Sequence, residues 1–277
     1  MTRAISTYYC QHTMLGVHLL DQIRRAGFDQ IEIYCAQPHF DYTNSSHVRE
    51  IAGWFSDSAV ELHSLHAPVY RGASGDSPHS VLSIAFVEKQ RRQDSMDEIK
   101  RVLEVAELAP FRYLIVHLGV PGEEFDLRKF DAALTSLEHL RLFARQRGVE
   151  ILLENILNDL STPRRLVEFF GHTHLRDLKV CFDSGHAHLD GGVDEALELL
   201  HGAIASTHLH DNAGTMDEHL LPGEGKIPWG KLVPALRKAG DVPLLLELRG
   251  SEAHPVRLEK AAAAAAKLER ILEESSK

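Results

Sequence analysis

Short apolar runs alternate with longer helical patterns eight times along the 277 residues of this chain. Several of the runs, such as Tyr113–Leu118 and Glu150–Glu154, consist almost entirely of Leu, Ile and Val between polar ends. Strands that are buried on both faces of a parallel sheet have this composition. The expected strands are Ala4–Tyr8, Gln30–Cys35, Val60–Ala67, Tyr113–Leu118, Glu150–Glu154, Leu178–Asp183, Ile204–His210 and Pro243–Glu247.

A helical pattern follows each expected strand. The clearest one repeats apolar residues at steps of three and four between Leu127 and Ala144, and another begins at Ser161-Thr162-Pro163 with an N-cap and an early proline. The other expected helices are Leu15–Ala26, Ser45–Phe55, Glu88–Ala109, Val193–Leu200, Trp229–Ala239 and Pro255–Glu274. A long loop rich in Gly, Ser and Pro covers 69–79.

Eight β-then-α units with almost nothing left over predict a closed parallel barrel, the (β/α)8 or TIM barrel, in a single domain over residues 1–277. An open doubly wound sheet is the structural rival. Such a sheet normally carries a glycine-rich phosphate loop after its first strand, and this chain has none there.

The last six expected strands each end at or beside a residue of a type that binds metals. Active sites of TIM barrels lie at the carboxyl ends of the strands, so these side chains are expected to converge. The strand-end residues are His66, His117, Glu154, Asp183, His210 and Glu247, with His208 one pleat before His210 and His186 three residues after Asp183. The loop after His210 adds Asp217 and His219. Imidazoles and carboxylates at this density predict a divalent-metal site.

These motifs resemble the xylose-isomerase-like TIM barrels, a superfamily of sugar isomerases and epimerases that also holds the endonuclease IV group, or AP endonuclease family 2. The resemblance rests on Glu154-Asn155, Asp183-Ser184-Gly185-His186, His208-Leu209-His210-Asp211-Asn212, Pro222-Gly223-Glu224-Gly225 and Glu247. It spans the chain from about Gly27 to Gly250.

Resemblance to the ketose 3-epimerase branch implies one divalent metal, Mn²⁺, Zn²⁺, Co²⁺ or Mg²⁺, held by Glu154, Asp183, His210 and Glu247. Whether His208 or His210 is the imidazole ligand stays open. The two glutamates would exchange a substrate proton beside a metal-polarised carbonyl. The substrate-binding residues expected beside them are His186, His66, His117 and Arg249. A small sugar, sugar acid or polyol is the expected substrate.

Resemblance to the endonuclease IV branch implies instead three zinc ions and cleavage at abasic sites in DNA. Its nine ligands would be His66, His117, Glu154, Asp183, His186, His208 or His210, Asp217, His219 and Glu247. The loop over 36–47 contains no Arg or Lys, however, and the formal net charge is −10. Both features weigh against a nucleic-acid partner, so we expect the isomerase or epimerase. A barrel that binds metal without catalysis is a third class, against which the presence of both glutamates counts.

Three further observations bound the interpretation. Cys10, Cys35 and Cys181 form no CxxC pair and indicate free thiols in a reducing cytoplasm. The sequence shows neither a signal peptide nor an apolar run of membrane-spanning length. Glu32 lies within an expected strand, where two readings stay open: its side chain points into the barrel as part of the site, or it supports another residue or forms a buried salt bridge. The number of subunits stays open, with a homo-oligomer possible.

Overall fold

The computed structural model describes residues 1–72, 80–175, 177–250 and 254–275, so most of the loop expected over 69–79 lies outside the described residues. Eight parallel strands form one sheet in the order β7-β6-β5-β4-β3-β2-β1-β8. They are β1 (Arg3–Ser6), β2 (Gln30–Tyr34), β3 (Glu61–His66), β4 (Tyr113–His117), β5 (Glu150–Glu154), β6 (Lys179–Asp183), β7 (Ile204–His208) and β8 (Leu244–Leu246). The fold is the TIM barrel that the alternation predicts.

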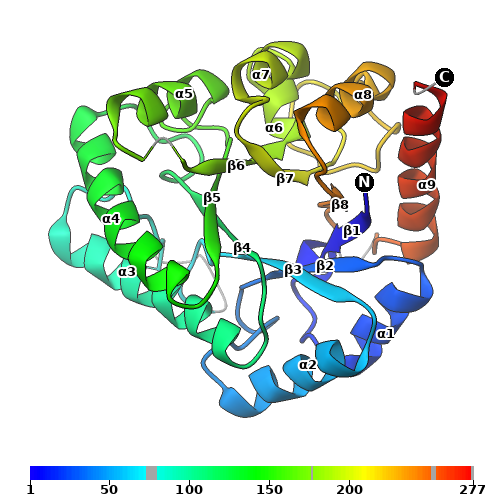
Figure 1. Ribbon diagram of the computed structural model, residues 1–277, viewed down its shortest axis with the longest axis horizontal. Helices are drawn as coiled ribbons and strands as arrows, with labels where there is room; N and C mark the ends of the chain where they lie inside the picture. Colours follow the sequence, from blue (N-terminus) through cyan, green and yellow to red (C-terminus); the bar gives the residue numbers. More distant parts are fainter. Residues whose placement is uncertain (73–79, 176, 251–253, 276–277) are drawn as a thin grey trace.

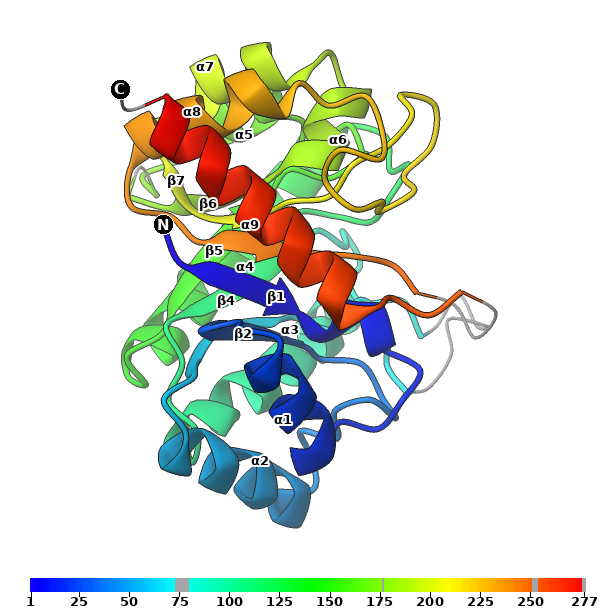
Figure 2. The ribbon, with the colours of Figure 1, turned by 90° about the vertical axis from the view of Figure 1, so that its right-hand side faces the viewer.

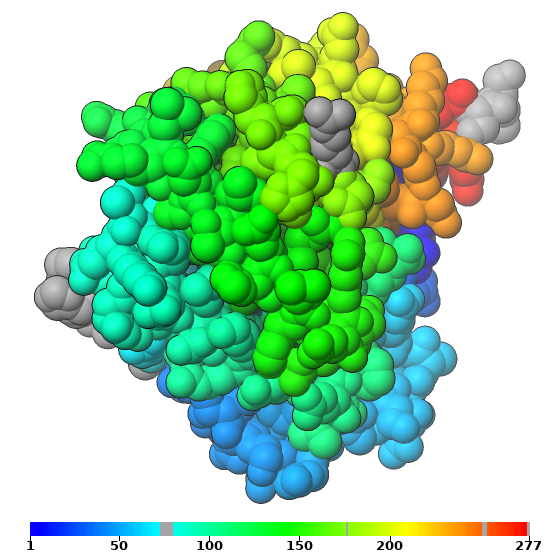
Figure 3. Space-filling model, turned by 60° about the vertical axis from the view of Figure 1, so that its left-hand side comes forward, coloured from blue at the N-terminus to red at the C-terminus, as the bar shows by residue number. Residues whose placement is uncertain are grey.

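Helices surround the strands (Figure 1). They are α1 (Val17–Arg25), α2 (Ser45–Asp57), α3 (Lys89–Glu104), α4 (Leu127–Arg145), α5 (Pro163–His172), α6 (Ser184–Leu189), α7 (Val193–Leu200), α8 (Trp229–Ala239) and α9 (Leu258–Glu274). Figure 2 shows α9 lying across the outside of the barrel over β1. Residues of α3 and α4, teal to green in Figure 3, form a continuous outer surface on another side. None of these helices is both long and apolar enough to cross a membrane.

The barrel closes between β7 and β8 through few backbone contacts. A single isolated bridge joins Leu209 to Leu246. The Leu209 amide donates to the Leu245 carbonyl at 2.8 Å, and the Glu247 amide donates to the Leu209 carbonyl at 3.2 Å. The Thr207 hydroxyl adds a bond to the Pro243 carbonyl at 2.7 Å. We call this junction the β7–β8 seam.

Alternation along the strands separates two cores. Ile151 and Leu153 of β5 belong to the large core between the strands and the helices, whereas Leu152 packs with Tyr113, Ile115 and Cys181 in a small cluster inside the barrel. Successive side chains of a strand point to opposite faces. The next inward positions after this cluster are the last residues of β4, β5 and β6, namely His117, Glu154 and Asp183. The strand period therefore delivers these residues to one layer.

Several elements differ from the sequence prediction, three of them in how the chain continues beyond or between the expected elements. The first strand ends at Ser6, because the chain turns there into the 3-10 helix η1 (Thr7–Cys10), where the Tyr8 amide bonds to the Ser6 hydroxyl. The helix expected to reach Ala109 ends at Glu104 and continues as η2 (Val105–Glu107). The prediction missed α6, a helix capped by Asp183, whose carboxylate accepts from the His186 amide at 2.7 Å.

Candidate functional site

Four residues meet at the carboxyl ends of β5, β6, β7 and β8. Glu154, Asp183, His208 and Glu247 each offer one ligand atom, and these atoms all lie within 4.8 Å of one another. All four side chains are buried. His208 Nδ1 lies 3.0 Å from Glu154 Oε1 and 3.6 Å from Glu247 Oε1. We call these four residues the central group.

The sequence prediction placed His210 with Glu154, Asp183 and Glu247, and left His208 as the alternative. The structure brings His208 into that group instead. β7 ends at His208, so the regular strand expected through His210 is not formed. His210 Nε2 lies 3.0 Å from Asp183 Oδ2, and its ring stacks on His219 with centroids 3.8 Å apart. His210 therefore lies beside the central group, in a different cluster.

A second group shares Glu154. His117 Nε2 lies 2.9 Å and His66 Nε2 lies 3.3 Å from Glu154 Oε2, while the other carboxylate oxygen faces His208. The His66 Nδ1 contacts the Ala67 carbonyl at 2.8 Å. The His117 Nδ1 is buried and has no hydrogen-bond partner. Glu154 thus joins two sets of candidate ligands through its two oxygens.

The third group consists of His186, His210, Asp217 and His219, which also offer atoms within 4.8 Å of one another. The loop after β7 delivers two of them, because a short antiparallel pairing of Asp211 with Leu220 returns the chain to the barrel. Within this loop His219 has a positive φ of 51°, which L-residues rarely adopt. Asp217 Oδ2 lies 3.0 Å from His219 Nε2 and 3.5 Å from His186 Nε2.

Buried polar atoms in the third group fit an additional ligand. His210 Nδ1 and Asp217 Oδ1 are 3.9 Å apart, and both are buried without a hydrogen-bond partner. Buried polar atoms in native proteins are normally paired. Nitrogen and oxygen donors without a thiolate suit Zn²⁺, Mn²⁺, Co²⁺ or Mg²⁺. The donor sets of the three groups therefore fit divalent metal ions.

The histidines balance the buried carboxylates electrostatically. Burial alone would raise the pKa of Glu154, but His208 and His117 outweigh it and hold that pKa well below its usual range. Burial raises the pKa of Glu247, and the neighbouring Glu154 adds to this rise. Burial opposes the charge on His208, yet the surrounding acidic groups raise its pKa well above the ordinary value. No Arg or Lys within the described residues pairs with these carboxylates, so the histidines carry their charge balance.

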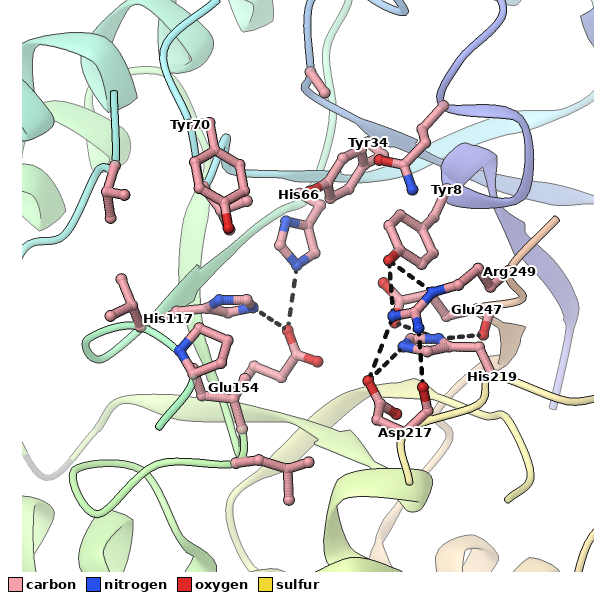
Figure 4. A pocket seen from close by; sticks show the side chains of 18 of the residues that line it. Tyr8, Tyr34, His66, Tyr70, His117, Glu154, Asp217, His219, Glu247 and Arg249 are labelled. Atoms are coloured by element: carbon pink, nitrogen blue, oxygen red, sulfur yellow. Dashed lines mark hydrogen bonds and ion pairs between the residues drawn. The ribbon is translucent and has the colours of Figure 1, made fainter. Parts of the chain in front are cut away.

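A cavity of about 670 Å³ opens above the central group. Glu154 and Glu247 line it, together with His66, His117 and His186, whereas Asp183 and His208 do not. Figure 4 shows His66, His117 and Glu154 on one side of the cavity and the group around Glu247 on the other. Apolar side chains cover part of the remaining wall, among them Val69, Val81, Val120, Pro121, Ile156 and Leu157.

Arg249 is the only Arg or Lys among the described residues that line this cavity. Its guanidinium donates to the Tyr8 hydroxyl at 3.1 and 3.2 Å and to the Asp217 carbonyl oxygen at 2.9 Å. The side chain remains 45% exposed, so part of the guanidinium is accessible from the cavity. Arg249 thus lies where the sequence prediction expected a substrate-binding residue.

Two residues of this region escaped the sequence prediction or were left open by it. Tyr8 was assigned to the first strand, but it follows that strand in η1 and lines the cavity. Glu32 is fully buried inside the barrel and contacts His208. Burial alone would raise the pKa of Glu32, but the charge of His208 and its hydrogen bond lower it to about 2. The sequence signal for the role of Glu32 was a single acidic residue between the apolar residues Ile31 and Ile33.

The family model described as "Xylose isomerase-like TIM barrel" matches residues 20–273. A solved D-tagatose 3-epimerase-like protein is similar over all of both chains, with a TM-score of 0.80 and 24% identity. The IOLI protein, solved with a bound zinc atom, covers 99% of both chains with a TM-score of 0.80 and 19% identity. A probable endonuclease 4 of Natronomonas pharaonis is 28% identical over 180 residues, which cover 56% of this chain and 63% of the relative.

Proposed function

This chain belongs to the xylose isomerase-like TIM barrel family, and on that basis we propose that it is a divalent-metal-dependent isomerase or epimerase. The proposed substrate is a small sugar, sugar acid or polyol that carries a carbonyl group. The ligands proposed for the metal are those of the central group, Glu154, Asp183, His208 and Glu247. A divalent ion held there would supply an electrophile for the carbonyl oxygen of the substrate.

One observation carries the proposal. Of the four residues of the central group, only Glu154 and Glu247 also line the cavity. These two carboxylates can therefore touch a substrate, while Asp183 and His208 lie beneath them. Their strands, β5 and β8, are separated by β6 and β7 around the barrel. A substrate between them would meet one carboxylate on each face.

Epimerisation beside a carbonyl needs this pair. One glutamate removes the proton from the carbon next to the carbonyl, and the other returns a proton to the opposite face. The C–H bond breaks as the electron pair moves toward the carbonyl oxygen, and a new C–H bond forms when the second carboxylic acid gives up its proton. Ile156 and Leu157 contribute apolar side chains to the cavity wall, and such a wall would limit the access of water to the reacting carbon.

The cavity supports a small polar substrate with one apolar side. Its volume lies within the range of about 300–1,000 Å³ that small-molecule sites occupy. Imidazoles of His66, His117 and His186 offer donors and acceptors for hydroxyl groups. Arg249 offers a cationic partner for a carboxylate, which is why sugar acids are included in the proposal. The free thiols of Cys10, Cys35 and Cys181 are consistent with a cytoplasmic enzyme.

Replacing each glutamate by glutamine tests the proposal. Glu154→Gln and Glu247→Gln keep the size of the side chain but cannot accept a proton, so each should slow exchange of substrate hydrogen with deuterated solvent by about 10²–10⁴-fold. Exchange is measured by NMR on a panel of ketopentoses, ketohexoses and keto sugar acids, with the metal content of each variant determined in parallel.

Glu150→Gln is the matched control, because Glu150 begins the same strand and is exposed at the opposite end of it. This control should retain the wild-type exchange rate. Wild-type exchange in either active-site variant would refute the assignment of two proton carriers. Bound metal in a wild-type protein that exchanges no substrate of the panel would count against the substrate class.

The three groups of candidate ligands favour a second candidate function, a zinc-dependent phosphodiesterase that cleaves DNA at abasic sites. In that function Asp217 and His219 help to hold a metal of their own, so the double variant Asp217→Ala/His219→Ala should lower the metal count and abolish cleavage. In the isomerase the central group should keep its metal in this variant. Arg249 is the only Arg or Lys among the described residues that line the cavity, which weighs against binding of a DNA backbone. Cleavage of an abasic duplex by the wild type, lost in the double variant, would favour the nuclease.

A further inference from the structure

Glu32 contacts the central group from behind. It is the third residue of β2, and its side chain is fully buried inside the barrel. His208 Nε2 lies 3.1 Å from Glu32 Oε1 and 3.2 Å from Glu32 Oε2. The opposite ring nitrogen, Nδ1, faces Glu154 and Glu247. His208 therefore lies between Glu32 on one side and the candidate metal ligands on the other.

Glu32 cannot act on a substrate directly. It neither lines the cavity nor belongs to any of the three groups of candidate ligands. Its ion-pair partner among the described residues is His208, and no described Arg or Lys pairs with it. The remaining bond comes from Ser64 on β3, whose hydroxyl donates to Glu32 Oε2 at 2.7 Å. The direct contacts of Glu32 with the central group therefore run through His208.

A carboxylate behind a ligating histidine has a defined chemical effect. A neutral imidazole carries one proton, and a metal needs the nitrogen that does not carry it. A carboxylate that accepts a hydrogen bond from the protonated ring nitrogen fixes the tautomer and holds the plane of the ring. It also increases the basicity of the other nitrogen. The contacts of Glu32 place the proton of a ligating His208 on Nε2 and leave Nδ1 free for the metal.

We propose that Glu32 is the positioning residue of the metal centre: it orients His208 and fixes its tautomer, and Ser64 orients Glu32 in turn. This inference rests on the metal binding of the proposed function but not on its substrate or reaction. Paired strands supply the support, because Glu32 and Ser64 are register partners across β2 and β3. The sequence feature that carries it is the acidic residue within the apolar run Gln30–Tyr34.

Metal affinity, measured without any substrate, tests the inference. The affinities of the wild type and of Glu32→Gln for Zn²⁺ and Co²⁺ are determined by competition with a chromophoric chelator. Removing an outer partner of a ligating histidine typically costs about 10–100-fold in metal affinity, and we expect a loss of this size in Glu32→Gln. Ser64→Ala, which keeps the carboxylate and removes only its hydroxyl partner, should give a smaller loss in the same direction.

Glu98→Gln is the matched control for burial of a glutamate. Glu98 lies on α3, outside the three groups, and is 5% exposed. Its carboxylate accepts a hydrogen bond from the Tyr42 hydroxyl and forms an ion pair with Arg101. This variant should lose stability and keep wild-type metal affinity. Affinity in Glu32→Gln within threefold of the wild type, or an equal loss in Glu98→Gln, would overturn the inference. If Glu32→Gln does not fold, Ser64→Ala carries the test, and unchanged affinity in that variant overturns the role of Ser64 and Glu32 together. A wild type that binds no metal would refute the metal dependence itself, which is a different result.

Discussion

Asp211 organises the loop that carries Asp217 and His219, and its replacement is the most sharply defined stability test in this molecule. Its side chain is fully buried and accepts four hydrogen bonds. Oδ1 accepts from the amides of Asn212 at 2.9 Å and Ile227 at 3.0 Å. Oδ2 accepts from the Gly223 amide and the Trp229 indole, both at 2.8 Å.

The magnitude follows from the number of donors. In Asp211→Asn one oxygen remains, so two of the four donors lose their acceptor whichever way the amide is turned. A buried donor without a partner costs about 1–3 kcal/mol. At least one of the two donors lost is buried in either orientation, since Asn212 is fully buried and Ile227 and Trp229 are each 5% exposed. The expected loss in the free energy of unfolding is therefore about 2–4 kcal/mol, taking the lower end of that range for the second donor.

Thermal and urea unfolding measure this loss. Trp229→Phe removes a single donor and should lie between the wild type and Asp211→Asn, while Asp241→Asn, at a side chain 92% exposed, should stay within about 0.5 kcal/mol of the wild type. Burial alone would raise the pKa of Asp211, but its hydrogen bonds, that of Trp229 first, lower it. Its stabilisation is thus present above about pH 4, the unfolded value, and is lost as the pH falls through the folded pKa. The difference in the free energy of unfolding between the wild type and Asp211→Asn should therefore narrow below about pH 4. An Asp211→Asn variant as stable as the Asp241→Asn control would refute this reasoning.

Two further outcomes are expected. In Gly185→Ala the added Cβ would lie 2.0 Å from Cε1 of His210, so overpacking should cost about 1–3 kcal/mol in urea unfolding, whereas Gly230→Ala, with open space around the new atom, should lose no stability. Equal stability of Gly185→Ala and the wild type would contradict the close packing of His210. Removal of metal held at 100 times its dissociation constant should lower the free energy of unfolding by about 2.7 kcal/mol, which unfolding with and without chelator measures. An unchanged unfolding curve after verified metal loss would contradict a site that requires the folded barrel.

The sequence predicted the strands of this fold well, because each one is a short apolar run with distinct polar ends. Glu150–Glu154 matches β5 residue for residue, and the other expected strands differ by one or a few residues at their ends. The short helix α6 was not predicted, because six residues that include Gly185 carry no helical period. Its cap depends on the Asp183 carboxylate, a residue that the sequence indicated only as a ligand.

The candidate site shows where sequence reasoning stops. The convergence of the strand ends followed from the topology alone, since parallel strands end at one face of a barrel. The sequence could not decide whether His208 or His210 joins the other candidate ligands, because that depends on where β7 ends. Likewise, nothing in the sequence pairs Glu32 with a residue 176 positions away. That contact exists only once the sheet curves and brings β2 opposite β7.

The β7–β8 seam gives the barrel one weak junction, and this has a consequence for how tightly its backbone amides are protected from solvent. Local opening should be easiest where the fewest hydrogen bonds must break, which is at the amides of Leu209 and Glu247. His208 ends one strand of this junction and Glu247 follows the other. If both side chains hold the same ion, that ion links the ends of β7 and β8 and opposes their separation. Hydrogen exchange at these two amides would then slow on metal binding, while the fully paired strands β4 and β5 would exchange at the same rate with or without it.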